Sequence, residues 1–327
     1  MSYHSTPWDD IEEPFYSPNY SPRRDNNSEI LKSPQSIYNY LDERVYGQEE
    51  YKKAISVFVY KALCGINSEK TILVASESGS GKSFLAAQLA ELLPGRVITA
   101  DSSSITPSGF KGSNHFTTIL SKVPSDGESY FVILDEINRF FERGLGSSWD
   151  SSTGLISELL LLLDTHNASV NCGTDEKPCW INPSHIYFIL LGSFSNLTDC
   201  KANNPIGFNA SISTPAKRRR TQITKEQIIE YLEQWPEILG RIPRIIVNQN
   251  LSESDFVNML KSPKYSPISQ LEKELGLSIH VSNRKIKEFG REAYESGQGF
   301  RKVRNCLLEI VDNALYNDVE TKEIFIK

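Results

Sequence analysis

A glycine-rich segment that follows a short apolar run limits the possible folds of this chain most. Residues 71–75 are β-branched or apolar, and residues 76–83 then read Ser-Glu-Ser-Gly-Ser-Gly-Lys-Ser. Apolar residues recur at helical spacing over residues 85–93. A strand, a glycine loop ending in Lys-Ser and a helix make a P-loop, whose backbone N–H groups surround the phosphates of a nucleotide. A Gly/Ser turn without a ligand is the alternative, which this context disfavours.

Each part of the P-loop has an expected role in binding ATP. Lys82 would reach the β and γ phosphates, and the hydroxyl of Ser83 would bind Mg²⁺. The first consensus glycine is replaced by Ser76, a position that closes the turn, so we expect a small residue to be tolerated there. The residues expected to line the phosphates are Glu77, Ser78, Gly79, Ser80 and Gly81.

A pair of acids follows the apolar run at residues 130–134. These acids are Asp135 and Glu136. Ligands gather at the carboxyl ends of parallel strands, so Asp135 is placed to hold Mg²⁺ and Glu136 to polarise the attacking water. An ordinary acidic turn is the alternative, but the P-loop upstream favours a catalytic pair and favours hydrolysis over transfer to another acceptor.

The order of strands and helices predicts an α/β fold. Helical stretches alternate with five short apolar runs, at residues 71–75, 96–100, 130–134, 186–191 and 244–247. Such alternation is typical of a parallel sheet between helices. We therefore expect a large P-loop domain with a five-stranded parallel sheet over residues 36–248. Residues 249–327 are predicted to form a small, mainly helical domain with one strand near 277–281.

The composition bounds the class of protein and its partners. The 327 residues are 39% hydrophobic and 23% charged, as in ordinary globular proteins. No apolar run of about 18 residues and no secretory signal pattern is present, so we predict a cytoplasmic protein without a membrane partner. Five cysteines, an odd number, fit a reducing compartment. A net charge of −6 gives no general attraction to nucleic acid, which is therefore not expected as a partner.

Two segments have the composition of disordered chain. Residues 1–35 are rich in Ser, Pro and Asn and lack an apolar period, which predicts a disordered tail. Residues 198–222 are predicted to be a flexible loop within the large domain. The basic run from Lys217 to Arg220 is interpreted as a solvated part of this loop rather than a nucleic-acid patch.

With these residues in view, the chain resembles the AAA+ family, and within it the ClpX family of unfoldases, over about residues 36–317. Residues 44–49, Arg-Val-Tyr-Gly-Gln-Glu, look like the family's Val-Ile-Gly-Gln segment. The resemblance implies that Val45 and Tyr46 clasp the adenine. A core pair that caps a helix is the alternative.

Two further segments are similar to the loops that line the pore of these unfoldases. Residues 109–112, Gly-Phe-Lys-Gly, fall where the family carries Gly-Tyr-Val-Gly. The resemblance implies that Phe110 and Lys111 contact the translocating polypeptide, whereas Phe110 packed within its own domain is the alternative. Residues 149–154 look like a second pore loop, followed by a helix over 155–163.

Residues 240–243, Gly-Arg-Ile-Pro, resemble the family's Gly-Arg-Leu-Pro box. The resemblance implies that Arg241 reaches the nucleotide of the neighbouring subunit and stabilises charge on the transferred phosphoryl group. It also implies a homohexamer with active sites between subunits. A surface arginine at the start of a strand is the alternative.

The Ile-Gly-Phe tripeptide in the loop at 198–222 resembles the family's docking motif for the ClpP peptidase. Here it consists of Ile206, Gly207 and Phe208. The resemblance implies a ClpP-like partner that receives Ile206 and Phe208 in hydrophobic clefts. The zinc domain that precedes the ATPase domain in the family is not found, because the first cysteine is Cys64.

The chain departs from the family in the small-domain box, which usually reads Gly-Ala-Arg-Gly-Leu-Arg. Residues 296–301 are Ser-Gly-Gln-Gly-Phe-Arg, so Gln298 stands where the phosphate-sensing arginine belongs. A neutral amide cannot make that charge-assisted contact, although Arg301 could compensate. We assign Gln298 and Arg301 to the nucleotide site. At the end of the fourth strand, Ser193 and Asn196 are candidates for sensing the γ-phosphate.

Together these features predict an ATPase that threads unfolded or tagged proteins through a hexameric pore into a ClpP-like peptidase, with ATP and Mg²⁺ as its cofactors. Two other functions stay open. An ATP-switched scaffold with little hydrolysis is suggested by Gln298 and the tail. A DNA-associated remodeller rests on the basic run alone.

Overall fold

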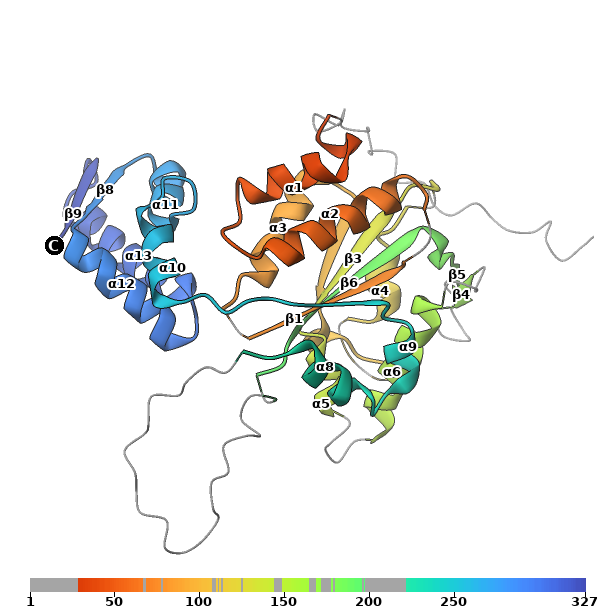
Figure 1. Ribbon diagram of the computed structural model, residues 1–327. Coiled ribbons are helices and arrows are strands. Elements are labelled where there is room, and N and C mark those ends of the chain that lie inside the picture. The colour runs from red at the N-terminus through yellow and green to blue at the C-terminus, as the bar shows by residue number, and fades with distance from the viewer. Residues whose placement is uncertain are drawn as a thin grey trace, which may run out of the picture.

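The computed structural model is described here for residues 29–66, 69–77, 79–107, 110, 112, 114–124, 126–143, 149–164, 169–171, 178, 180–195, 197 and 222–327 (Figure 1). Several segments singled out in the sequence lie outside these ranges. They are the tail up to residue 28, the P-loop residue Ser78, the pore-loop residue Lys111, the sensor candidate Asn196, and residues 198–221 with the Ile-Gly-Phe tripeptide and the basic run.

A parallel sheet of five strands forms the centre of the large domain, which confirms the predicted α/β fold. Its order is β2-β3-β6-β1-β7, and every neighbouring pair is parallel. The strands are β1 (Thr71–Ser76), β2 (Val97–Asp101), β3 (Tyr130–Asp135), β6 (Ile186–Ser193) and β7 (Arg244–Val247). All six residues of β1 are buried, as expected for a strand covered on both faces.

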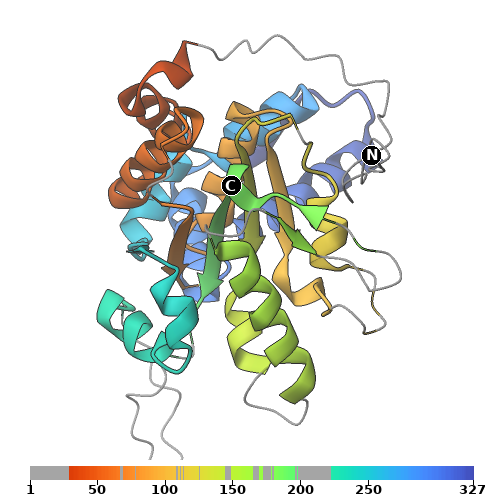
Figure 2. The ribbon, with the colours of Figure 1, turned by 90° about the vertical axis from the view of Figure 1, so that its right-hand side faces the viewer.

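Helices pack on both faces of this sheet because successive strand residues point to opposite sides. In β1, Ile72 and Val74 belong to one core cluster and Leu73 and Ala75 to the other. The first cluster includes α1 (Pro34–Asp42), α2 (Glu49–Leu63) and α3 (Lys82–Leu92). The second includes α4 (Phe116–Leu120), α5 (Asn138–Arg143), α6 (Trp149–Leu163), α8 (Lys225–Leu232) and α9 (Pro236–Gly240). Figure 2 shows α1 and α2, in red, apart from α6, in yellow-green.

Residues 149–154 are helical, so the expectation of a loop that precedes a helix at residue 155 is wrong, whereas a role of this segment in a pore stays a prediction. Helix α6 begins at Trp149 and continues to Leu163. Gly154 then passes close to the segment before Phe110, since a Cβ on Gly154 would lie 3.1 Å from the Cβ of Pro107.

The C-terminal helices form a separate core, which we call the C-terminal unit, residues 253–326. It contains α10 (Glu253–Lys261), α11 (Pro267–Leu275), β8 (Ser278–Val281), α12 (Asn283–Ser296), α13 (Phe300–Asn317) and β9 (Glu323–Ile326). Strand β9 was not predicted, and it pairs in parallel with β8. Only Ile324 and Ile326 of β9 are buried, which is too short a pattern to identify a strand. The exact limits of the domains stay a prediction.

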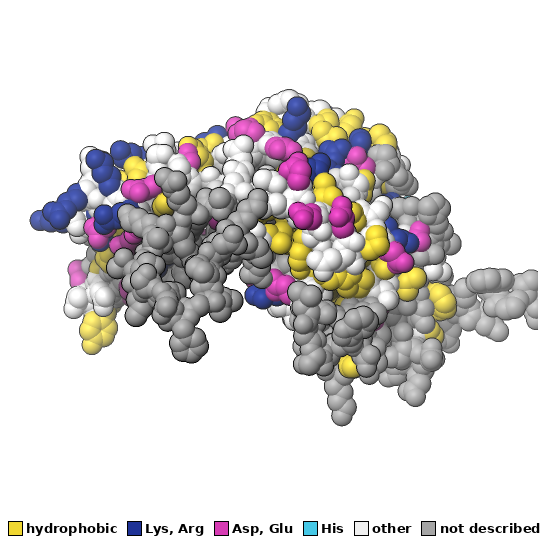
Figure 3. All heavy atoms as spheres, turned by 60° about the horizontal axis from the view of Figure 1, so that its bottom comes forward, with side chains coloured by type: hydrophobic (Ala, Val, Ile, Leu, Met, Phe, Trp, Pro, Cys, Tyr) yellow, Lys and Arg dark blue, Asp and Glu magenta, His cyan; other side chains and the backbone are white. Residues whose placement is uncertain are grey.

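The remaining elements are short connections at the rim of the large domain. They are η1 (Ile30–Lys32), η2 (Ser102–Ser104), η3 (Pro183–His185) and the antiparallel pair β4 (Val170–Asn171) and β5 (Trp180–Ile181). On the face shown in Figure 3, hydrophobic side chains reach the surface between acidic and basic ones. Within the described ranges, no helix is both long enough and apolar enough to cross a membrane.

Candidate nucleotide site

The P-loop connects the end of β1 to the start of α3. Gly79 and Gly81 have φ angles of +79° and +88°, in the left-handed region that favours glycine. Gly81 caps α3, and Lys82 is its first helical residue. Successive backbone N–H groups in such a turn, together with the positive end of the helix dipole, create a site for phosphate groups.

Ser76 shows why the first consensus glycine is dispensable in this chain. Its side chain is only 1% exposed, and its φ angle is not positive. The Ser76 hydroxyl accepts a hydrogen bond from Ser80 Oγ at 2.7 Å and donates one to the carbonyl of Glu77 at 3.0 Å. The Ser76 hydroxyl therefore connects two residues of the turn, and the small side chain fits there, as expected.

Three strand ends bring the predicted ATP-binding groups together. Lys82 Nζ donates to Ser193 Oγ at the end of β6 at 2.6 Å. Ser83 Oγ donates to Asp135 Oδ2 at the end of β3 at 2.7 Å. Burial lowers the pKa of Lys82. The negative charge of Asp135 raises this pKa, and the positive charge of Arg301 lowers it further. Arg301 of α13 is thus close enough to Lys82 for their charges to interact.

The oxygen atoms of Ser83 and Asp135 fit a magnesium ion that is shared with phosphate. Mg²⁺ usually binds one or two protein oxygens and completes its octahedron with water and phosphate oxygens. A hydroxyl and a carboxylate 2.7 Å apart provide such a partial set. No group of three or more His, Cys, Asp or Glu side chains that could hold a metal by itself occurs in the described part of the chain.

Glu136 lies in a strained backbone conformation next to this pair. Its φ angle is +55°, which is uncommon for a residue other than glycine and occurs often at functional sites. Its N–H donates to Asp135 Oδ1 at 2.9 Å. Its carboxylate accepts from Arg139 Nε at 3.4 Å, and both side chains are about half exposed. An exposed pair of this kind contributes little stability, so Arg139 can release Glu136 at small cost.

Asn138 is a positioning residue that the sequence analysis missed. It is buried at the start of α5, where Oδ1 accepts from the N–H of Ser193 at 2.9 Å and Nδ2 donates to Glu142 at 3.0 Å. Asn138 thereby holds the residue that binds Lys82. The available signal was a polar residue directly after Ile137, at the start of a helix that contains Phe140 and Phe141, two positions after Glu136.

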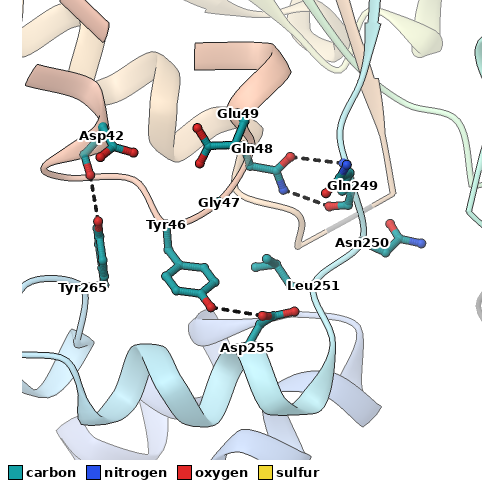
Figure 4. Close-up of a pocket in the computed structure, with 10 residues that line it drawn as sticks. All are labelled: Asp42, Tyr46, Gly47, Gln48, Glu49, Gln249, Asn250, Leu251, Asp255 and Tyr265. Carbon is teal, nitrogen blue, oxygen red and sulfur yellow. Dashed lines mark hydrogen bonds between the residues drawn. The ribbon is translucent and has the colours of Figure 1, made fainter. Parts of the chain in front are cut away.

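A pocket of about 400 Å³ lies between the large domain and the C-terminal unit (Figure 4). Tyr46 and Leu251 provide its apolar surface, and the ring of Tyr46 packs edge-on against Tyr265 at 5.5 Å. The hydroxyl of Tyr46 donates to Asp255 at 3.1 Å. Burial raises the pKa of Tyr46, and the hydrogen bond to Asp255 raises it further. Tyr265 donates to the carbonyl of Asp42 at 2.8 Å.

Only one member of the predicted adenine pair lines this pocket. Tyr46 does so, whereas Val45 is 4% exposed and packs in the core with α1 and α2. Val45 is therefore a core residue in this structure, and its contact with adenine stays a prediction. Leu251, which follows β7, lies opposite Tyr46 in Figure 4 and was missed because nothing in its local sequence distinguishes it from a core leucine.

The small-domain box lies directly against the P-loop. A Cβ on Gly79 would be 2.7 Å from the carbonyl oxygen of Gly297, and a Cβ on Gly299 would be 2.9 Å from that of Gly79. Real side chains do not reach such distances, so glycine is needed on both sides. The exposed residues Gln298 and Arg301 are thereby placed next to the phosphate site.

Arg241 lies apart from the P-loop of the same chain. It follows α9, where it donates to the carbonyl of Glu237 at 3.1 Å and lies 3.6 Å from Asp164 at the end of α6. Figure 1 shows α9 on the side of the sheet away from the C-terminal unit. Phe110 is 48% exposed, with its N–H donating to the carbonyl of Pro107 at 3.2 Å.

Comparisons with known proteins agree with this geometry. The model of the ATPase family associated with various cellular activities (AAA) matches residues 72–195. The ATP-dependent Clp protease ATP-binding subunit ClpX of Treponema denticola is 24% identical over 89% of this chain and 78% of its own length. The subunit ClpX 2 of Wolinella succinogenes is 27% identical, over 90% and 79%. ClpX of Borrelia duttonii is 25% identical, over 90% and 76%. The matches along nearly the whole chain, together with the P-loop on a five-stranded parallel sheet, support an AAA+ ATPase that is similar to ClpX subunits.

Proposed function

We propose that this ATPase is a homohexameric protein unfoldase that threads unfolded or tagged polypeptides through a central pore into a ClpP-like peptidase. The observation that carries the proposal is the convergence of Lys82, Ser83, Asp135 and Ser193 at the strand ends. It occurs in a chain that is similar over about nine-tenths of its length to ATP-binding subunits of the Clp protease.

In the proposed reaction, each residue of the site has one task. Lys82 and the backbone N–H groups of residues 77–83 would bind the triphosphate. Ser83 and Asp135 would hold Mg²⁺, which would supply positive charge to the phosphates. Glu136 orients the attacking water and accepts its proton. Arg241 of the neighbouring subunit would stabilise the charge that develops on the transferred phosphoryl group. Tyr46 and Leu251 would enclose the adenine in the pocket beside the P-loop.

The exposed aromatic ring of Phe110 supports a role in gripping the polypeptide. A phenylalanine that is 48% exposed costs solubility unless it contacts a partner. We expect Phe110→Ala to retain ATP hydrolysis within about twofold and to lose most unfolding of a tagged fluorescent protein, because one hydrophobic anchor typically contributes about 2 kcal/mol or more to a contact. Phe84→Ala, which removes another exposed phenylalanine, is the matched control. Unfolding at the wild-type rate in Phe110→Ala would exclude this pore assignment.

Docking on a peptidase is tested separately from hydrolysis. Deleting residues 206–208 should leave the ATPase rate unchanged, since the hydrogen-bonded cluster at the P-loop is formed by Lys82, Ser83, Asp135 and Ser193. It should abolish degradation by a ClpP-type peptidase. The measurement compares ATP turnover with fluorescence loss of a tagged substrate, both with the peptidase present. Replacing residues 210–212 by glycines controls for general damage to the loop. Degradation that survives the deletion would show that docking occurs elsewhere.

A scaffold with little hydrolysis is favoured by one observation, the neutral Gln298 in the small-domain box next to the P-loop. Steady-state ATPase with and without an unfolded protein separates the two functions. The unfoldase should turn over ATP continuously and faster when substrate is added, whereas a scaffold should show neither behaviour.

A further inference from the structure

Gln48 connects the P-loop to the chain segment that leads into the C-terminal unit. It is 6% exposed and precedes α2 in a left-handed conformation with φ +58°. Its Nε2 donates to the carbonyl oxygens of Ser80, at 3.2 Å, and of Gln249, at 2.8 Å. Its Oε1 accepts from the N–H of Gln249 at 3.1 Å. The side-chain amide of Gln48 therefore donates both to the P-loop and to the segment before α10.

The segment that Gln48 holds lies between the two cores. Gln249 follows β7, the edge strand of the sheet, and precedes α10, the first helix of the C-terminal unit (Figure 1). Figure 4 shows the paired hydrogen bonds between the Gln48 side chain and Gln249. Because these bonds involve the backbone of Gln249, they restrain the direction in which the chain leaves the sheet.

The C-terminal unit also contacts the P-loop at the neighbouring residue. Gly79 lies against the backbone of Gly297 and Gly299, while Gln48 holds Ser80. The P-loop is thus linked to the C-terminal unit in two ways, through the small-domain box (residues 296–301) and through the segment before α10. Neither link involves a charged side chain, and the box has Gln298 where a charged contact to phosphate is expected.

We propose that Gln48 is the positioning residue that couples nucleotide occupancy of the P-loop to the orientation of the C-terminal unit. The inference rests on the proposed function only in that ATP binds at the P-loop. When phosphates bind at the P-loop, we expect the Ser80 carbonyl to reorient and Gln48 to transmit that change to the backbone of Gln249. A ligand shifts a conformational equilibrium only through contacts that differ between the two states, and the proposal requires this hydrogen bond to be such a contact.

Substitutions can separate coupling from simple stability. Gln48→Met keeps the length of the side chain and removes its hydrogen bonds. Gln48→Asn keeps the amide on a shorter side chain, and Asn tolerates a positive φ angle. Gln249→Ala is the matched control, because the exposed side chain of Gln249 makes none of these bonds.

The test measures the distance between spin labels, carried by unnatural amino acids at the exposed positions Lys53 in α2 and Lys302 in α13, with and without a non-hydrolysable ATP analogue. Analogue affinity and thermal melting are recorded for each protein. We expect a distance change in the wild type and in Gln249→Ala. In Gln48→Met and Gln48→Asn the change should be lost, while affinity falls about tenfold or less, as expected for lost hydrogen bonds.

The proposal is overturned if either folded Gln48 variant keeps the wild-type response, if Gln249→Ala loses it, or if the wild type binds the analogue without a distance change. Should Gln48→Met fail to melt cooperatively, the result for Gln48→Asn decides. A wild-type protein that does not bind the analogue contradicts the ATP site itself as well as the coupling, which distinguishes failure of the proposed function.

Discussion

Replacing Glu136 with glutamine should reduce steady-state ATP hydrolysis by about 10²- to 10⁴-fold, the usual contribution of a general base, and leave ATP binding intact. The reason is that the amide cannot accept the proton of the attacking water, whereas the binding groups Lys82, Ser83 and Asp135 are untouched. Phosphate release measures turnover, and calorimetric titration with ATP measures binding.

Glu142→Gln is the matched control for this prediction. Glu142 also accepts a hydrogen bond from Arg139, at 3.0 Å, so the control alters a neighbouring carboxylate of the same cluster. It should retain most of the activity. Hydrolysis by Glu136→Gln at the rate of the control would mean that another group activates the water.

Replacing Arg241 with alanine should reduce hydrolysis by about 10³- to 10⁵-fold, as for other arginine fingers, without unfolding the protein. Its ion pair with Asp164 contributes little to stability because both side chains are partly exposed to water. Mixing this variant with Glu136→Gln should restore part of the activity. In the mixture, an Arg241→Ala subunit still has Glu136, and a Glu136→Gln neighbour still has Arg241. A site formed between these two subunits therefore contains both residues.

The mixing experiment decides whether the site lies between subunits. Activity is measured for each variant alone and for equal mixtures after the subunits have exchanged. Arg304→Ala, which removes an exposed guanidinium paired with Glu274, should hydrolyse ATP normally. A mixture as inactive as its parents would place Arg241 and Glu136 in the same subunit's site. Wild-type hydrolysis by Arg241→Ala alone would exclude Arg241 from catalysis.

Features that depend on neighbouring residues in the chain were predictable. The P-loop is identified by the strand before it, its glycines and the helix after it, and both glycines adopt positive φ angles. The buried runs that became β1, β3 and β6 are recognisable because strands covered on both faces are apolar throughout. Asp135 follows from its place at the end of such a strand.

Other features could not be predicted because they depend on contacts between distant segments. Val45 and Tyr46 are adjacent apolar residues, and only the packing of α1 and α2 buries the first and leaves the second at the pocket. Gln48 meets partners at Ser80 and Gln249, which are distant in the chain. Strand β9 forms by pairing in parallel with β8, which lies about 45 residues earlier in the chain.

The sequence by itself determined the α/β sheet, the phosphate loop and the acids beside it, since short-range periodicity and backbone conformation specify all three. The tertiary structure alone decided that Gly79 touches the small-domain box, that Gln48 joins the P-loop to the segment before α10, and that Arg241 lies apart from its own P-loop. Those relations depend on how two separately packed cores are placed against each other, and no local pattern in the chain encodes that placement.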